Sequence, residues 1–201
     1  VLTSRGLGDV YKRQLFDYVT INVSSPNTKN LRDLQKPEVL ENILQNVNAI
    51  NISLKKQVPI FIKIAPDLNE NNVTEILNVC EENKVSGLIA TNTTISPRTL
   101  KKPKNFEGGL SGKPLFKPSN RILKLLAKRK KPSTALIGVG GIFSASDVYE
   151  KIRLGASAVQ IYSGFVYKGP MHIRKIEMEL ENLLLNDGYG SIDRAVGASI
   201  R

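Results

Sequence analysis

The stretch LIGVGGIFSASDVYEKIRLGASAVQIYS, residues 136–163, decides the fold class because it contains a complete strand–helix–strand unit. The apolar runs at its two ends, 136–141 and 158–163, have the length and composition of strands that are buried on both faces. Ser144 or Ser146 can cap the amphipathic helix between them, and Gly155 can end it in a left-handed conformation. The stretch predicts two parallel strands joined by a helix.

The same pattern extends over the rest of the chain. Three further apolar runs are predicted to be strands, at 18–23, 60–64 and 87–92. Amphipathic stretches between and after the runs are predicted to be helices, at 38–55, 71–83, 118–130, 145–154 and 170–185. Strand and helix thus alternate, which indicates parallel βα units in either an open doubly wound sheet or a closed eightfold barrel.

The position of the polar residues favours the barrel. They stand at the last positions of the predicted strands or directly after them, at Asn22, Lys63, Thr91, Asn92, Gly140, Gly141, Tyr162 and Ser163. In a (β/α)8 barrel this rim carries the active site, and the loops after the last two strands commonly hold a phosphate. We therefore predict an α/β protein with the (β/α)8 TIM-barrel fold and a phosphate-bearing cofactor.

The number of units is smaller than a barrel needs. Five βα units fit within the 201 residues, and eight would take about 290 residues, within the usual range for this fold. We expect the N-terminal strands to be missing, with residues 15–201 forming the C-terminal part of the barrel. Residues 1–14, VLTSRGLGDVYKRQ, show no strand pattern. We expect them to be non-native to the domain, such as a remnant of assembly.

Composition excludes several kinds of site. Hydrophobic residues make up 41% of the chain, yet no window reaches the roughly 18 consecutive apolar residues of a membrane helix. The single cysteine, Cys80, excludes an internal disulfide and a cysteine-based zinc site, and we predict no metal. A Ser-His-Asp triad would have to use the one histidine, His172, which lies in a connection leading into a helix.

The basic charge of the chain is local. The formal net charge is +11 at pH 7, and residues 101–131 alone carry +10 of it. Only Phe106 and Phe116 accompany these cations, whereas a groove for single-stranded nucleic acid interleaves many aromatic side chains with its cations. We interpret the segment as a solvated basic surface and expect no nucleic acid; an anionic membrane surface is the second interpretation.

The segment NVSSPNT, residues 22–28, follows the first predicted strand and contains the sharpest local motif. Pro26 ends strand pairing and biases Ser25 toward an extended conformation, so that Ser25 is presented on a loop. The amides of this cluster can bind a planar, amide-rich ligand with both donors and acceptors. A plain βα turn rich in Ser, Pro and Asn explains the same residues equally well.

Lys63 interrupts the apolar run IFIKIA, residues 60–65. A lysine in a buried strand needs an anionic partner, because burying an unpaired charge is costly. It is either an edge-strand lysine that faces water or a charge aimed at a ligand, and its place near the end of the strand favours the ligand. The segment ATNTT, residues 90–94, offers hydroxyl and amide groups at the same rim, although turn capping also explains it.

Glycines occur in two clusters, GGLSG at residues 108–112 and GVGG at residues 138–141. Glycine lets backbone amides approach a phosphate closely. The second cluster is not a dinucleotide-binding motif, because Phe143 stands where that pattern requires its third glycine.

Six ordered motifs between residues 17 and 201 resemble dihydroorotate dehydrogenases of the membrane-associated, quinone-dependent class 2 branch. They are DYVTINVSSPNTKNLRDLQ, IFIKIAPDL, GLIATNTTISP, GGLSGKPL, IGVGGIFSASDVYEKIRLGASAVQIYSGFVYKGP and VGASI. The resemblance implies a (β/α)8 barrel that binds FMN and oxidises dihydroorotate to orotate in pyrimidine biosynthesis. It places the N-terminal membrane helices and the first barrel strands of the family outside this chain.

The resemblance also implies roles for individual residues. Ser25 matches the catalytic base, which removes a proton from C5 of dihydroorotate while hydride passes from C6 to flavin N5. The related soluble class places cysteine there, so Ser25 indicates class 2. The matching substrate-binding positions are Asn22, Asn27, Asn92 and Thr93. The matching FMN-binding positions are Asn22, Lys63, Thr91, Gly112, Gly141, Tyr162 and Ser163.

The partners implied by the resemblance are dihydroorotate or orotate and ubiquinone or another membrane quinone. The implied location is the mitochondrial inner membrane in a eukaryote and the cytoplasmic membrane in a bacterium. Two alternatives remain open. An FMN barrel similar to tRNA-dihydrouridine synthases would give the basic segment a purpose, but Ser25 does not fit the cysteine of that catalytic loop. The other alternative is a truncated, non-catalytic gene product that binds no ligand well.

Overall fold

The computed structural model describes residues 17–54, 56–96 and 107–200. The predicted boundary at residue 14 and the first part of the basic segment lie outside these described residues. Within them, no helix has both the length and the apolar character needed to cross a membrane.

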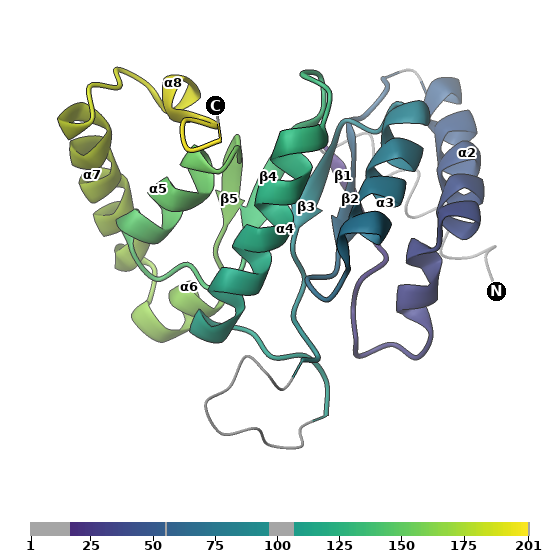
Figure 1. Cartoon of the computed structure of the whole chain (residues 1–201), viewed down its shortest axis with the longest axis horizontal. Helices are drawn as coiled ribbons and strands as arrows, with labels where there is room; N and C mark the ends of the chain where they lie inside the picture. Colours follow the sequence, from purple (N-terminus) through teal and green to yellow (C-terminus); the bar gives the residue numbers. More distant parts are fainter. Residues whose placement is uncertain (1–16, 55, 97–106, 201) are drawn as a thin grey trace.

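The sheet has five parallel strands in the order in which they occur along the chain. They are β1 (Val19–Asn22), β2 (Ile60–Ile64), β3 (Gly87–Ala90), β4 (Ala135–Val139) and β5 (Ala158–Gln160). A doubly wound sheet reverses its strand order at a switch point, and this sheet does not. The main helices stand on one face of the strands (Figure 1). The arrangement is that of five consecutive units of a (β/α)8 barrel, which confirms the predicted fold.

Each predicted helix is present, with ends that differ by a few residues. The main helices are α2 (Pro37–Ser53), α3 (Glu70–Glu82), α4 (Phe116–Arg129), α5 (Ala145–Arg153) and α7 (Met171–Asn186). Hydrophobic periodicity did not predict the short segments, because each is too brief to show a period. These are η1 (Leu31–Gln35), η3 (Lys113–Leu115), α6 (Ser163–Lys168) and α8 (Ile192–Ala195).

The two faces of the sheet are packed against different groups of residues. On the outer face, Ile60, Ile62 and Ile64 of β2 are buried in the main core between the sheet and the helices. Burial of each such side chain stabilises the fold by about 1.5–3 kcal/mol. On the inner face a smaller apolar cluster contains Phe61, Ile89, Ile137 and Val139. Because side chains alternate along a strand, Lys63 shares the inner face with Phe61.

The prediction that every strand is buried on both faces is wrong for three of them. β3 is fully buried, but the inner-face residues of β2, Phe61 and Lys63, are half-buried, and β1 and β5 are partly exposed. Each of these two strands pairs on one side only, which leaves its other edge without a neighbour in the described sheet. The predicted strands also extended too far, because Gly140 and Gly141 have φ values of 110° and 73° and leave the strand conformation.

The predicted ends of α5 are confirmed. Ser144, rather than Ser146, is the N-cap, and its side-chain oxygen accepts a hydrogen bond from the backbone N–H of Asp147 at 3.2 Å. Gly155 follows the helix with a φ of 107°. A Cβ atom there would lie 2.6 Å from the Cβ of Ala127 on α4, so this glycine permits both the turn and the close approach of α4.

These contacts predict the result of two glycine substitutions. Gly155→Ala should lower the free energy of unfolding by about 3 kcal/mol, because it combines a strained φ with a collision. Gly188→Ala is the matched control, since Gly188 also has a positive φ but open space around it, and it should cost about 1 kcal/mol. Urea unfolding of both variants measures the difference, and equal losses would contradict the packing described.

Candidate active site

A cavity of about 260 Å³ lies at the rim of the sheet, beyond the carboxyl ends of the strands. Pockets that bind small ligands have volumes of about 300–1,000 Å³, so this cavity is large enough to take part of such a ligand. The loops after β3, β4 and β5 and the segment that includes Gly112 enclose it. Its lining includes eight residues predicted from the sequence, namely Lys63, Thr91, Asn92, Thr93, Gly112, Gly141, Tyr162 and Ser163.

The three other predicted residues, Asn22, Ser25 and Asn27, lie beside this cavity rather than in its wall. Asn22, at the end of β1, is linked to the loop after β3. Its Oδ1 accepts a hydrogen bond from Asn92 Nδ2 at 3.1 Å and one from Ser24 Oγ at 2.9 Å. Asn92 Nδ2 also donates to Ser24 Oγ at 3.2 Å. The amides of Asn22 and Asn92 therefore meet at the rim, whereas Asn27, the second amide of the predicted cluster, lies against Gly108.

The two serines of the motif lie in different environments. Ser24 is fully buried and belongs to the amide cluster just described. Ser25 is half-buried, and its Oγ accepts a hydrogen bond from the backbone N–H of Asn27 at 3.3 Å. Of the two hydroxyls, that of Ser25 is the one presented at the surface of the rim. The sequence motif did not distinguish their roles, and Ser24 was not predicted as a site residue.

The glycines at 108 and 109 serve close packing rather than phosphate binding. A Cβ atom at Gly108 would lie 2.7 Å from Asn27 Oδ1, and one at Gly109 would lie 2.7 Å from Pro26 Cγ. The segment therefore lies directly against the loop that bears Ser25. An antiparallel bridge between Thr94 and Leu110 holds it there. Within the first glycine cluster only Gly112 lines the cavity, with Ser111.

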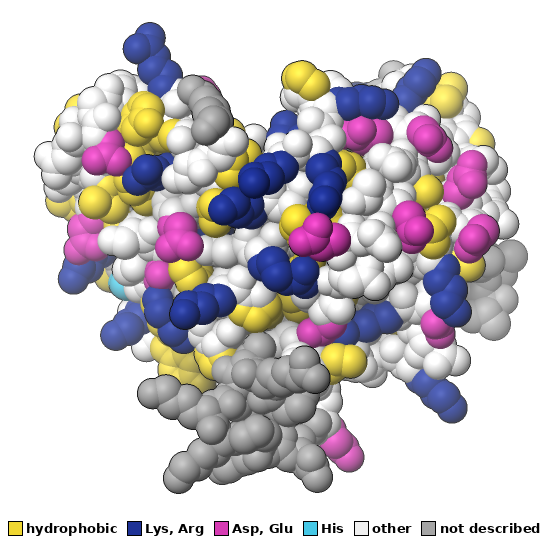
Figure 2. Space-filling model, viewed as in Figure 1, with side chains coloured by type: hydrophobic (Ala, Val, Ile, Leu, Met, Phe, Trp, Pro, Cys, Tyr) yellow, Lys and Arg dark blue, Asp and Glu magenta, His cyan; other side chains and the backbone are white. Residues whose placement is uncertain are grey.

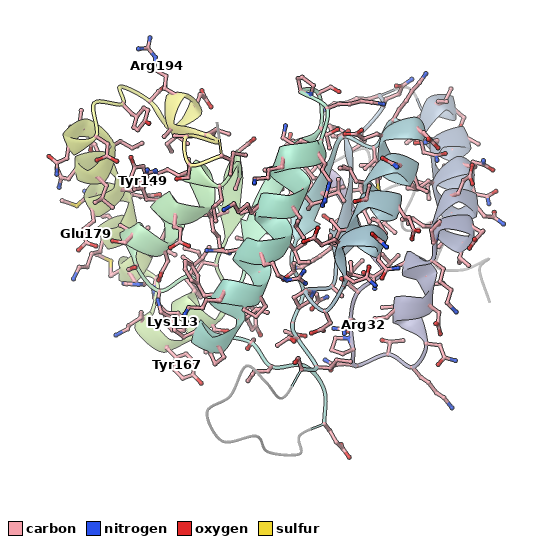
Figure 3. All side chains as sticks on the ribbon, viewed as in Figure 1. Arg32, Lys113, Tyr149, Tyr167, Glu179 and Arg194 are labelled. Atoms are coloured by element: carbon pink, nitrogen blue, oxygen red, sulfur yellow. The ribbon has the colours of Figure 1, made fainter. Side chains whose placement is uncertain are left out.

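Arg32 joins three loops of the rim, and the sequence analysis missed it. Its Nε donates to the backbone oxygen of Ser24 at 3.1 Å, after β1. Its Nη2 donates to the backbone oxygen of Thr93 at 2.8 Å, after β3. Its Nη1 forms an ion pair of 2.8 Å with Asp67, after β2. Figure 3 shows Arg32 at the rim end of the molecule. No local pattern could reveal these contacts, because they join loops far apart in the sequence.

Asp67 extends the same network. Its carboxylate accepts hydrogen bonds from the Thr94 hydroxyl and from the backbone N–H of Ile95, the latter at 3.1 Å. Both side chains of the ion pair are about four-fifths buried, so solvent screens their attraction only in part. The network fixes the loop that carries Asn92 and Thr93 relative to the loop that carries Ser25.

Among the described residues that line the cavity, Lys63 is the only one with a charged side chain. β2 pairs with β1 on one side and β3 on the other, so the interpretation of Lys63 as an edge-strand residue is wrong. Burial lowers the pKa of its ammonium group. Among the ion pairs of the described residues none involves Lys63, and the cavity wall contains no acidic residue. The cavity therefore favours an anionic or electron-rich ligand.

The end of the cavity near β4 and β5 is formed by glycines and by side chains that carry hydroxyl groups. Gly112, Gly140 and Gly141 all have positive φ values, and a Cβ atom at Gly141 would lie 2.7 Å from the backbone nitrogen of Phe116. The Ser163 hydroxyl donates to Ser111 Oγ at 3.1 Å across the opening. Backbone amides, hydroxyls and the absence of carboxylates in this wall suit a phosphate group. The residues present thus fit a phosphate-bearing cofactor.

Comparisons with known proteins agree with this arrangement. The family profile described as "Dihydroorotate dehydrogenase" matches residues 8–184. The chain is similar to the dihydroorotate dehydrogenase (quinone) of Myxococcus xanthus, with 45% identity over 188 residues that cover 93% of this chain and 52% of that protein. It is also similar to that of Cereibacter sphaeroides, with 46% identity over 182 residues, 90% of this chain and 51% of that protein.

A solved structure shows the same fold. The crystal structure of the Eimeria tenella dihydroorotate dehydrogenase in complex with ferulenol superimposes with a TM-score of 0.91 and 35% sequence identity. The match covers 97% of this chain and 57% of that chain. The chain spans about half the length of the curated relatives it matches.

The Arg32 network predicts that two ion pairs contribute unequally to the free energy of unfolding. Arg32→Ala should lower the free energy of unfolding by about 2 kcal/mol, because it leaves a partly buried carboxylate and two carbonyl oxygens without their donor. Arg129→Ala removes the pair with Glu70, which is more exposed, and should cost less than about 0.5 kcal/mol. Urea unfolding compares the two, and a loss for Arg32→Ala no larger than that for Arg129→Ala would contradict the network.

Proposed function

This chain belongs to the dihydroorotate dehydrogenase family, and we propose that the protein containing it oxidises dihydroorotate to orotate in pyrimidine biosynthesis. The observation that carries the proposal is the arrangement of the rim. The accessible hydroxyl of Ser25 and the linked amides of Asn22 and Asn92 stand next to a cavity that contains Lys63 and ends in glycines. A planar substrate would bind beside Ser25 and the two amides, and a phosphate-bearing cofactor would bind in the cavity.

We propose FMN as the cofactor. Thr91, Lys63 and Asn22 would hold its ring system, and Gly112, Gly141, Tyr162 and Ser163 would hold its ribityl phosphate end. The chemistry that a bound FMN supplies is the acceptance of the hydride lost from C6 of the substrate. The ammonium group of Lys63 is placed to stabilise negative charge at the inner face of the sheet.

Ser25 is proposed as the catalytic base that takes the proton from C5 of dihydroorotate. A serine hydroxyl is a weak base at its ordinary pKa, so it needs a route by which the proton leaves. Its half-buried position at the rim gives it access to solvent, and a water molecule can then accept the proton. Because the hydroxyl is neutral, it adds no charge that would repel an anionic substrate.

The substrate would contact Asn22, Asn27, Asn92 and Thr93. Both Nδ2 donors of Asn92 are engaged, by Asn22 Oδ1 and Ser24 Oγ, and its Oδ1 accepts from the backbone N–H of Thr93 at 2.8 Å. The Thr93 hydroxyl also donates to Asn92 Oδ1 at 3.4 Å, so the Asn92 amide is held in one orientation by bonds within the protein. Asn22 uses its Oδ1 in these bonds, which leaves its Nδ2 to donate. The pair therefore presents the Nδ2 donor of Asn22 to a carbonyl oxygen of a pyrimidine ring.

Three further statements belong to this proposal. Residues 15–201 form the C-terminal part of the barrel. A quinone is the electron acceptor, as it is in the names of the quinone-dependent relatives. The protein associates with a membrane, the mitochondrial inner membrane or the bacterial cytoplasmic membrane.

The basic surface does not favour the tRNA-modifying alternative. Of its described cations, Lys117, Lys124 and Lys128 are exposed on the outer face of α4, which packs on the outside of the sheet. Lys113 lies in η3 and is paired with Asp147. Figure 2 shows basic side chains spread across this face. The cavity lies at the rim, so these cations are not placed to guide a nucleic acid into it.

The proposal predicts the behaviour of Ser25→Ala in the protein with its complete barrel. The variant should still purify with FMN, because Ser25 is remote from the glycine end of the cavity. Reduction of the flavin by dihydroorotate at neutral pH should be slower by a factor of about 10²–10⁴, the range for loss of a general base. Stopped-flow absorbance measures the rate, with Ser133→Ala, an exposed and distant serine, as the control. An unchanged rate would remove Ser25 from the mechanism.

A further inference from the structure

Lys151 on α5 is a fully buried lysine that the proposed reaction does not use. Its Nζ donates hydrogen bonds to Asn120 Oδ1 at 2.6 Å and to Ser119 Oγ at 3.1 Å. It also lies 5.1 Å from the centre of the Phe116 ring. All three partners are neutral and belong to α4. Within the described part of the chain, no carboxylate lies within ion-pair distance of this ammonium group.

The acidic groups nearest to Lys151 are engaged elsewhere. Glu150 accepts a hydrogen bond from Asn120 Nδ2 at 2.7 Å. The carboxylate of Asp147 accepts from Lys113 Nζ at 2.8 Å and from the backbone N–H of Phe143 at 2.9 Å. Burial lowers the pKa of Lys151 to about 7, and Glu150 and Asp147 oppose this shift only in part. The ammonium group is therefore incompletely compensated.

Lys151 lies directly behind the glycine turn of the cavity. Ser119, which holds its Nζ, also donates to the backbone oxygen of Val139, and the Ser119 Cβ would lie 3.3 Å from a Cβ placed at Gly140. The Cβ of Phe116, whose ring faces the ammonium group, would lie 2.6 Å from a Cβ placed at Gly141. A single layer of side chains therefore separates the charge of Lys151 from Gly140 and Gly141.

We propose that Lys151 is a positioning residue for the phosphate of the flavin cofactor, a buried cation whose charge is completed by the anion at the Gly140–Gly141 turn. The proposal rests on the function proposed above, since it requires FMN at this cavity. In this proposal the phosphate of the cofactor is the anionic partner of Lys151, whose neighbours within the protein compensate its charge only in part. Since water is excluded between the two charges, salt screens their attraction only weakly.

The proposal links cofactor binding to proton uptake. A phosphate dianion nearby favours the charged form of lysine and raises its pKa in the complex. Below about pH 7 Lys151 is protonated with or without FMN, so affinity is at its highest. As the pH rises above this value, the free protein loses the proton that the complex retains, and affinity falls until the pKa of the complex is passed. The second pKa of the phosphate, about 6, lies below this window.

The test is flavin binding by the complete-barrel protein, freed of cofactor, measured by quenching of flavin fluorescence from about pH 7 to about pH 9. For the unchanged protein, the dissociation constant for FMN should rise about tenfold over this range, as a shift of one pKa unit requires. Lys151→Met should bind FMN about tenfold more weakly at pH 7 and lose the pH dependence. Riboflavin, which lacks the phosphate, should bind equally to both proteins at every pH.

Two further variants make the result decisive. Lys151→Arg keeps a charge that does not titrate, so it should bind FMN without the loss of affinity at high pH. Lys124→Met, on the exposed face of α4, should behave as the unchanged protein. If Lys151→Met binds FMN as tightly as the unchanged protein, or weakens riboflavin equally, Lys151 has no role toward the phosphate. If the unchanged protein binds no FMN, the proposed function fails first and this inference with it.

Discussion

The ion pair between Arg32 and Asp67 is the contact on which the geometry of the rim depends. Parallel strands bring their carboxyl ends to one edge, but they do not fix how the loops beyond that edge meet. Arg32 does so with three donors directed at three loops, a use of the guanidinium group that lysine could not reproduce. The amide cluster of Asn22 and Asn92 and the exposure of Ser25 follow from that arrangement.

The two ends of the site have opposite chemical character, and the fold separates them. At the end near β1, neutral amides and hydroxyls offer donors and acceptors without charge. At the end near β4 and β5, glycines expose backbone amides in a wall that lacks carboxylates. Lys63 lies on the inner face of the sheet, and Lys151 on α5 lies behind the Gly140–Gly141 turn. In their charged forms they would place positive charge on two sides of the cavity. Such a layout would separate a flat, anionic substrate from a phosphate-bearing cofactor.

The regular part of this structure could be predicted from the sequence, and the contacts between loops could not. Alternating apolar runs and amphipathic stretches identified five strands and five helices, and the residues at strand ends identified seven of the sixteen residues of the cavity wall. Ser24 and Arg32 were missed because their roles depend on loops that meet only in three dimensions. Lys151 was missed because a lysine in an amphipathic helix is usually solvated. The exposure of β1 and β5 depends on their neighbours rather than on their own residues.

The central claim is that dihydroorotate is the substrate, and a half-reaction tests it most directly. The complete-barrel protein carrying its flavin is mixed with dihydroorotate in the absence of oxygen, and the visible absorbance is followed. The account predicts that the yellow colour is lost and returns when a quinone is added. A protein that keeps its colour with dihydroorotate, and loses it with NADPH instead, would contradict the account.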